Sequence, residues 1–88
     1  MIVYYVYIIE TVSTNGKKRY YTGYTNNLYR RWNEHRNGQG AKFCRGKKRL
    51  ELKYFETFTT RKEAMRRELE IKTYSRKQKS ELINSIYT

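Results

Sequence analysis

Glu68 is the residue whose position most clearly suggests chemistry. Its neighbours on one side of the helix expected around it are apolar: Ala64, Met65, Leu69 and Ile71. The other charges of this helix fall on the opposite side as ordinary i, i+4 pairs, Glu63 with Arg67 and Arg66 with Glu70. A carboxylate against an apolar stripe costs several kcal/mol unless it is paired or binds a metal. Glu68 is therefore either a metal ligand or a border residue paired with Lys72.

Arg31 and His35 form a second candidate pair, one turn apart in another expected helix and beside Leu28 and Trp32. An arginine guanidinium is a natural clamp for a phosphate group. A nearby histidine can donate to a phosphate oxygen or shuttle a proton. The structural alternative is an arginine whose methylenes cover Trp32, next to a histidine at the border of the core.

Tyrosine is the third candidate, because ten tyrosines in 88 residues exceed what a core requires. Each buried hydroxyl needs a hydrogen-bond partner, whereas an accessible tyrosine can stack on a nucleobase or act as general acid or base. Four of them fall on the two strands of one expected hairpin: Tyr5, Tyr7, Tyr21 and Tyr24. Packing on a half-buried sheet accounts for most of these positions.

The composition narrows the kinds of site. Twenty Lys and Arg against eight Glu give a net charge of +12, and the sequence contains no Asp. This charge favours a polyanionic partner, most often nucleic acid; the alternatives are a solubilising surface or binding to ribosomal RNA without chemistry. A metal site built on two Asp is excluded, and the single cysteine, Cys44, excludes an internal disulfide and a multi-cysteine zinc site.

Length and cysteine usage suggest the size and location of the protein. A sequence of 88 residues fits one small domain, residues 1–88. Its apolar start, residues 1–9, is too short to cross a membrane and lacks the basic region of a signal peptide. Together with the lone cysteine, this predicts a protein of the reducing cytoplasm with no membrane partner.

The elements that must position these residues follow from the hydrophobic pattern. Asn15-Gly16 favours a hairpin turn, and Gly23 inside a strand suggests the close approach of another backbone or a ligand. The predicted elements are strands over 2–10 and 19–25, a helix over 28–37, a basic loop over 38–49, a strand over 50–58, and helices from 59 or 60 to about 74 and from 75 onward. The order β-β-α-β-α-α is that of a mixed α+β protein.

The last predicted helix has the clearest start signal. Ser75 and Gln78 have the spacing of a capping box. The apolar residues that would attach this helix to the rest of the protein are Leu82, Ile83, Ile86 and Tyr87. Thr59 or Thr60 can cap the preceding helix in a similar way.

Two short motifs in the hairpin carry a resemblance to a known family. Thirteen residues separate Tyr5-Val6-Tyr7 from Tyr21-Thr22-Gly23. The pattern continues through residues 24–28, Arg30-Arg31, Glu34-His35, residues 38–43, Arg45-Gly46, residues 63–68 and Ile71-Lys72. This ordered set resembles the GIY-YIG nuclease superfamily over nearly the whole chain. It is most similar to the short stand-alone branch, related to the excinuclease N-terminal domain and to Slx-type endonucleases. Two departures are Tyr5, in place of the motif glycine, and Tyr24, where many relatives have lysine.

The resemblance implies a small three-stranded antiparallel sheet flanked by about three helices, and hydrolysis of DNA with one divalent ion, Mg²⁺ or Mn²⁺. It implies that Glu68 binds the metal, Arg31 contacts the scissile phosphate, and His35 is the histidine frequent in this branch. Tyr7 and Tyr21 match the two motif tyrosines; we favour Tyr7 as general base and Tyr21 as the group that positions water or phosphate, with the reverse open. Because Mg²⁺ on one carboxylate keeps most of its waters, the lack of Asp is no obstacle.

The basic loop and the adjacent helix are expected to bind DNA phosphates, so that affinity falls steeply with salt: Arg30, Arg36, Lys42, Arg45, Lys47 and Lys48. The leading hypothesis is an endonuclease of DNA repair or recombination that selects nicked, flapped or branched DNA, because so short a sequence leaves no room for a long sequence-reading interface. Two alternatives stand. One is a nucleic-acid-binding module without catalysis, and the other is a nuclease that needs a targeting partner protein.

Overall fold

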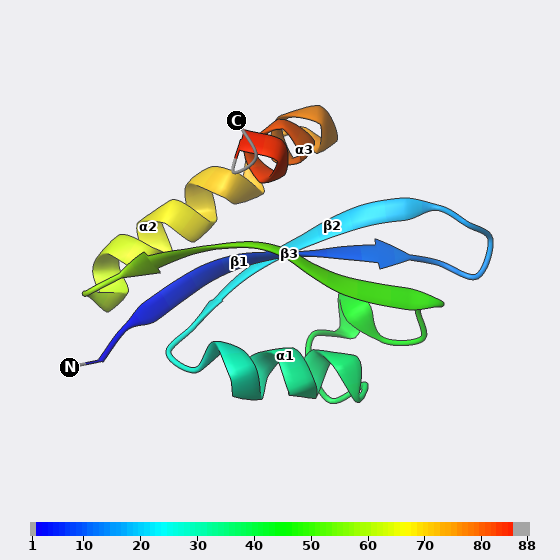
Figure 1. Cartoon of the computed structure of the whole chain (residues 1–88), viewed down its shortest axis with the longest axis horizontal. Coiled ribbons are helices and arrows are strands. Elements are labelled where there is room, and N and C mark those ends of the chain that lie inside the picture. Colours follow the sequence, from blue (N-terminus) through cyan, green and yellow to red (C-terminus); the bar gives the residue numbers. More distant parts are fainter. Residues whose placement is uncertain (1, 86–88) are drawn as a thin grey trace.

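A three-stranded antiparallel sheet carries helices on both of its faces in the computed structural model, which describes residues 2–85 (Figure 1). Its elements are β1 (Tyr4–Val12), β2 (Lys18–Thr25), α1 (Leu28–Arg36), η1 (Lys42–Cys44), β3 (Arg49–Phe58), α2 (Arg61–Lys72) and α3 (Arg76–Asn84). Strand β1 lies in the centre, between β2 and β3. The α+β class, the antiparallel sheet and the predicted order of strands and helices are confirmed.

The strands are longer at one end than the sequence predicted. β1 begins at Tyr4 instead of residue 2 and continues to Val12, because its last residues still pair with both neighbouring strands. Arg49, predicted as loop, pairs with Val12 and begins β3. The predicted loop over 38–49 also contains the single turn η1. The hairpin turn is confirmed, and Gly16 adopts the positive φ of +85° that the turn requires.

The helix starts follow the predicted capping side chains. Thr60 accepts a hydrogen bond from a backbone N–H at the start of α2, and Ser75 and Gln78 form a complete capping box at the start of α3. Helices α1 and α2 end one and two residues before their predicted ends. Ile83 of α3 is buried as expected. Two further apolar residues predicted for this helix, Ile86 and Tyr87, lie outside the described residues.

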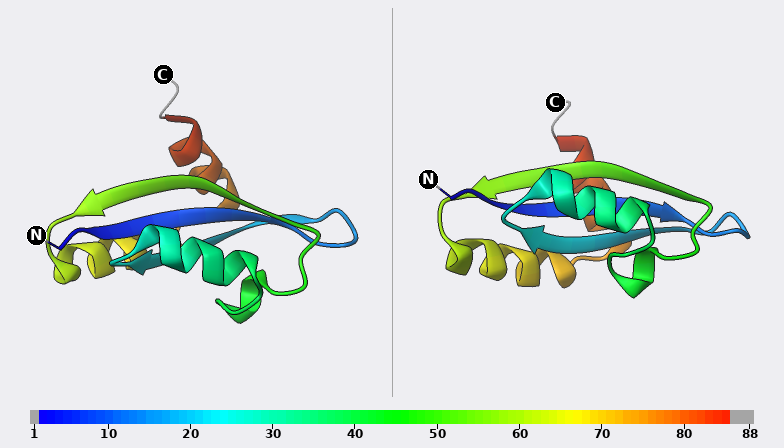
Figure 2. Two further views of the ribbon diagram at one scale, coloured as in Figure 1. Left: turned by 60° about the horizontal axis from the view of Figure 1, so that its bottom comes forward. Right: turned by 90° about the horizontal axis from the view of Figure 1, so that it is seen from below.

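The two faces of the sheet have separate cores. One cluster lies under α2 and α3 and is formed by Val6, Ile8, Ala64, Ile71 and Ile83. The other lies under α1 and η1 and contains Tyr7, Ile9 and Cys44, with Leu28 and Trp32 packed against them. Figure 2 shows α1 crossing the face of the sheet opposite α2. Because side chains alternate along a strand, adjacent residues of β1 supply the two cores.

Helix α2 buries a narrower stripe than its sequence predicted. Within this helix, all of which is described, the buried residues are Ala64 and Ile71, two turns apart. Met65 and Leu69 were expected on the apolar side but are 42% and 62% exposed. The helix therefore touches the sheet along a single line, and Glu68 lies on that line between the two buried residues.

The charge pairing of α2 also differs from the prediction. Arg67 was expected to pair with Glu63 on the exposed side. Instead its guanidinium donates two hydrogen bonds, of 2.9 and 2.8 Å, to the Glu56 carboxylate on β3. At i+3 from the buried Ala64, Arg67 faces the sheet, where Glu56 is the closer partner. Within residues 2–85, no helix is long and apolar enough to span a membrane.

Candidate active site

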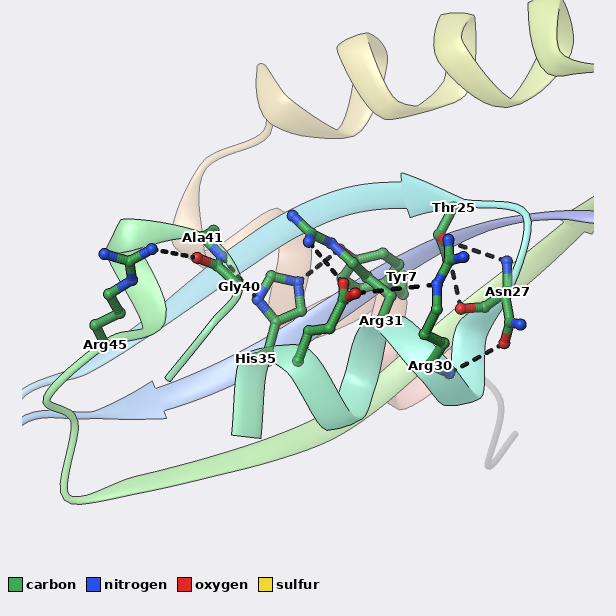
Figure 3. A network of polar contacts seen from close by, with 10 residues as sticks. Tyr7, Thr25, Asn27, Arg30, Arg31, His35, Gly40, Ala41 and Arg45 are labelled. Atoms are coloured by element: carbon green, nitrogen blue, oxygen red, sulfur yellow. Dashed lines mark hydrogen bonds and ion pairs between the residues drawn. The ribbon is translucent and has the colours of Figure 1, made fainter. Parts of the chain in front are cut away.

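Tyr7 and His35 meet in the core between β1 and α1, where they are 2% and 1% exposed. The Tyr7 Oη lies 2.8 Å from the His35 Nε2, and the His35 Nδ1 accepts a hydrogen bond of 3.2 Å from the backbone N–H of Ala41 (Figure 3). A neutral imidazole carries one N–H. Because Nδ1 acts as the acceptor, the proton resides on Nε2, which donates to the Tyr7 oxygen.

His35 is neutral at physiological pH. Burial, and then the nearby Arg31 guanidinium, lower the pKa of His35 to about 4, although Glu34 acts in the opposite direction. Its Nδ1 lone pair is engaged by Ala41 and its Nε2 proton points at Tyr7. His35 is therefore arranged as a hydrogen-bond donor to Tyr7 and not as a base.

Both tyrosines of the site are protonated in the free protein. Burial is the largest influence on each, and it raises the pKa of Tyr7 and of Tyr21 above the ordinary value of 10.0, while Arg31 lowers it. The net shift of both pKa values is upward because burial outweighs one guanidinium. A phenolate at Tyr7 requires additional positive charge beside it.

Tyr21 forms the rim of this cluster. Its ring centroid lies 6.4 Å from that of Tyr7 and 5.3 Å from that of His35, in an edge-on contact. On its other side it stacks on Phe43 of η1, with 5.9 Å between ring centroids. Phe43 was absent from the predicted site because its position depends on how residues 38–48 fold, which no sequence pattern specified.

Two glycines allow the polar groups to approach so closely. A Cβ on Gly23 would lie 2.5 Å from the Tyr7 Oη. The sequence predicted the approach of a backbone or a ligand at this strand position, and the structure places a tyrosine side chain there. A Cβ on Gly40 would lie 2.3 Å from the His35 Nδ1 and 2.9 Å from its Cα. Gly40 was predicted only as part of a basic loop, and its contact with His35 is a feature of the tertiary structure.

Arg31 extends from α1 toward Tyr7 and Glu34. Its Nη1 donates to the Glu34 Oε1 at 2.9 Å, and this bond is the largest cause that lowers the pKa of Glu34. The Arg31 side chain keeps 32% of its surface exposed, so it can reach a ligand. Glu34 was not among the predicted site residues, although its i+3 spacing from Arg31 was a usable signal.

Glu68 lies on α2, at the side of Tyr21. Its side chain is 14% exposed, and its Oε2 lies 3.6 Å from the Lys72 Nζ. The paired border residue, one of the two alternatives for Glu68, is thus present in the structure. The Glu68 carboxylate is also close enough to contribute to the raised pKa of Tyr21.

The residues around Glu68 fit one type of metal site. Among residues 2–85, no group of three or more His, Cys, Asp and Glu side chains could hold a metal ion. A cage made by the protein alone therefore does not fit. Mg²⁺ commonly binds through one or two carboxylates, its own waters and substrate phosphates. Such an ion fits with Glu68 as its ligand from the protein, once Lys72 gives way.

The predicted DNA-binding residues fall in two segments: Arg30 and Arg36 lie on α1, Lys42 begins η1, and Arg45, Lys47 and Lys48 follow it. Lys47 lies over the Phe43 ring at 5.1 Å, and the Arg45 guanidinium donates to the Gly40 carbonyl at 3.3 Å. The structure thereby brings these two cations next to the cluster. Arg36 bonds Asn33 on the exposed side of α1, away from Tyr7.

A family comparison agrees with this fold and this set of residues. A family model described as the GIY-YIG catalytic domain matches residues 3–81. The chain therefore belongs to the GIY-YIG family, which is a family of nucleases.

Individual proteins that are similar to this chain carry the name UPF0213. The chain is 46% identical over 79 residues to a UPF0213 protein of Haloquadratum walsbyi, covering 90% of this chain and 84% of that protein. It is 46% identical over 81 residues to a UPF0213 protein of Clostridium perfringens, covering 92% and 83%. The solution NMR structure of a UPF0213 protein from Bacillus halodurans is 38% identical, with a TM-score of 0.54 and coverage of 94% of this chain and 84% of that one. These names state no reaction.

Proposed function

We propose that this protein is a metal-dependent endonuclease that hydrolyses DNA phosphodiester bonds. The observation that carries the proposal is the buried hydrogen bond from His35 to Tyr7, with the Arg31 guanidinium beside it. A core built for stability gains little from a buried histidine and phenol. The same pair is useful where a tyrosine oxygen must carry negative charge for a moment.

The phosphate would bind at the exposed part of Arg31. An open groove of about 360 Å³ lies there, and its lining includes three cations, Arg30, Arg31 and Arg61, and one carboxylate, Glu34. Guanidinium groups hold phosphate oxygens with parallel hydrogen bonds. Arg31 would therefore orient the scissile phosphate and offset the charge that develops on it.

Tyr7 would act as general base through its Oη. In its phenolate form this oxygen takes a proton from the water that attacks phosphorus, while the bond from phosphorus to the leaving sugar oxygen breaks and that oxygen takes up a proton from solvent. The His35 Nε2–H and Arg31 stabilise the phenolate. Tyr21, at the rim, would position the water or the phosphate. The hydrogen bond from His35 favours Tyr7 over Tyr21 as the base.

Glu68 would hold the divalent ion, Mg²⁺ or Mn²⁺. Such an ion, when bound beside the phosphate, supplies positive charge that neutralises phosphoryl oxygens and lowers the pKa of nearby acids. The positive charge that Tyr7 lacks in the free protein would then be present only with metal and substrate. The rate should rise with pH through the neutral range, because more Tyr7 is ionised.

The preferred substrates would be nicked, flapped or branched DNA, as in repair or recombination in the cytoplasm. A non-catalytic DNA-binding module, or a nuclease that needs a targeting partner, is the second candidate. The observation in its favour is the ion pair of Glu68 with Lys72, which accounts for Glu68 without a metal.

Cleavage assays test the proposal directly. Labelled duplex, nicked, flap and four-way-junction DNA would be incubated with the protein at low salt in Mg²⁺, Mn²⁺ or EDTA. Glu68→Gln should abolish the metal-dependent cleavage. Glu81→Gln, which removes an exposed carboxylate of α3, should leave it intact. Binding without cleavage in every metal, unchanged by Glu68→Gln, would favour the non-catalytic module.

A further inference from the structure

A small pocket wraps around the outer edge of β2, next to the candidate active site. It has a volume of about 210 Å³ and is lined by Arg19, Tyr20, Phe43, Tyr74, Arg76 and Lys79. These residues come from β2, η1, the connection between α2 and α3, and the start of α3. The pocket is smaller than the roughly 300–1,000 Å³ of sites that enclose a whole small molecule. Its size suits one part of a larger ligand.

The pocket has an unbalanced positive charge. Arg19, Arg76 and Lys79 line it together, and no acidic residue of the described chain is part of its lining. Among the described residues, none of these three cations has a carboxylate within ion-pair distance, whereas Arg31 has one and Arg67 has two. Burial, and then the nearby Lys72, lower the pKa of Lys79. An anion in the pocket would relieve this repulsion.

The stability of α3 does not account for these cations. The first turn of α3 contains no acidic residue, although helix starts favour Asp and Glu over Lys and Arg. Arg76 and Lys79 are therefore in a position that is slightly unfavourable for the helix itself. Their location is better explained by what they face.

Aromatic rings form the remaining walls and connect the pocket to the candidate site. Phe43 is 36% exposed, and one of its neighbours is Tyr21, on which it stacks. Tyr20 and Tyr74 complete the aromatic walls. Bases of single-stranded nucleic acids stack on such rings while cations contact the phosphates. The combination favours a nucleotide over a run of acidic residues, because Asp and Glu side chains have no flat rings to stack.

We propose that this pocket binds a nucleotide of single-stranded DNA that flanks the cleaved bond. The inference rests on the proposed function for the position of that bond and extends it to a substrate class, DNA with a single-stranded segment. The Phe43 ring would separate the two sites. It stacks on Tyr21 of the candidate active site and also lines the cationic pocket. None of the DNA-binding residues predicted from the sequence is among the three cations involved.

The test compares two charge-matched double variants. Arg76→Gln/Lys79→Gln removes two cations of the pocket, and Lys62→Gln/Lys77→Gln removes two exposed cations of α2 and α3 that do not line it. Binding of a fluorescent oligothymidylate would be followed by anisotropy, without metal, between about 50 and 200 mM salt. Polyglutamate would serve as a competing polyanion without bases.

We expect the pocket variant to reduce the salt slope of log K by about 1.4, since each phosphate contact to a single strand contributes about 0.7. Its affinity at the lowest salt should fall on the order of tenfold, with the control variant near wild type. Equal effects of the two variants would contradict the proposal that the pocket binds a nucleotide. Competition by polyglutamate as strong as by unlabelled oligothymidylate would contradict it as well.

Cleavage data separate this inference from the proposed function. If the wild-type protein cleaves DNA and both double variants bind oligothymidylate alike, the proposed nucleotide site is contradicted and the proposed endonuclease activity is supported. If the wild-type protein does not cleave DNA but its binding of oligothymidylate depends on Arg76 and Lys79, the nucleotide site is supported and the proposed endonuclease activity is contradicted.

Discussion

On the face toward α2 and α3, the sheet buries Val6 and Ile8 against aliphatic side chains. On the face toward α1, the same strand buries the phenol of Tyr7, which lies between Val6 and Ile8 in the sequence. The Tyr7 hydroxyl is joined to His35 by a hydrogen bond. The first face gains the free energy of apolar burial. The second gives up part of that gain to hold polar groups in a fixed arrangement. The difference shows how one central strand supplies both the stability of the fold and the candidate site.

A large effect on cleavage is expected from Arg31→Ala on the α1 face. Loss of a guanidinium that stabilises charge on the reacting phosphate should lower the cleavage rate about 100- to 1,000-fold. Arg36→Ala, one turn further on the exposed side, is the matched control and should weaken DNA binding in a salt-dependent way only. Rates at saturating protein, measured for both variants, would sharpen the comparison; similar rates would remove Arg31 from the chemistry.

The opposite face should respond in stability. Ile71 is fully buried in the cluster under α2. Ile71→Ala should lower the free energy of unfolding by about 2–5 kcal/mol, because it removes methyl groups and leaves a cavity. Urea unfolding followed by circular dichroism gives the value. Leu69→Ala, on the exposed side of the same helix, should cost well under 1 kcal/mol, and a similar loss from both variants would mean that α2 does not pack as described.

The α1 face should make stability depend on pH through the chain's single histidine. The pKa of His35 is lowered to about 4 in the folded state, from 6.5 in the unfolded chain. Between these values the unfolded state binds the proton more readily, so stability is full above about pH 6.5 and falls as pH drops toward 4. The loss should be on the order of 3 kcal/mol.

Unfolding free energies measured between pH 4.5 and 7 check this expectation. The carboxylates with lowered pKa, Glu34, Glu51 and Glu56, lose their contributions mainly below this range. His35→Gln should therefore show a nearly flat profile over it. A wild-type profile that is equally flat would contradict a buried neutral His35.

A smaller effect is expected from the addition of a single methyl group on the α1 face. Gly40→Ala places a Cβ against the His35 ring and backbone, and should cost about 1–3 kcal/mol of stability while displacing His35 from Tyr7. Gly38→Ala is the control, since Gly38 has a positive φ of +78° but no atom within 4 Å of the added Cβ. Its cost is backbone strain alone, so cleavage should fall only in Gly40→Ala. Equal activity of the two variants would show that the position of His35 does not matter.

Spacing along the sequence was enough to predict the elements and to single out Arg31 and His35, whereas the resemblance to the GIY-YIG superfamily singled out Tyr7 and Tyr21. The structure brings these four residues together. The hydrogen bond from the Ala41 N–H that fixes the His35 tautomer could not be predicted, because every residue except proline has a backbone N–H. The contact of Phe43 with Tyr21 depends on the course of an irregular segment. Spacing within a helix thus predicted which residues share a face. The contacts that loop residues make could be seen only in the structure.

The pairing of Arg67 failed for a related reason. Spacing within α2 offered Glu63 as its partner, and a local rule could not show that Glu56, eleven residues earlier on β3, lies closer. For Glu68 the sequence left two alternatives, and the structure contains the local one, the pair with Lys72. Metal binding by Glu68 stays a prediction.

Two neighbouring residues of β1 provide the most direct test of the proposed site. Tyr7→Phe removes one oxygen on the α1 face, and Ile8→Val removes one methylene on the α2 face. Initial rates of metal-dependent cleavage of nicked DNA would be measured for both, per folded protein. We predict a loss of about 100- to 10,000-fold for Tyr7→Phe and wild-type rates for Ile8→Val, which should only lower stability by about 0.5–1.5 kcal/mol. Wild-type cleavage by Tyr7→Phe would contradict the assignment of the chemistry to the α1 face.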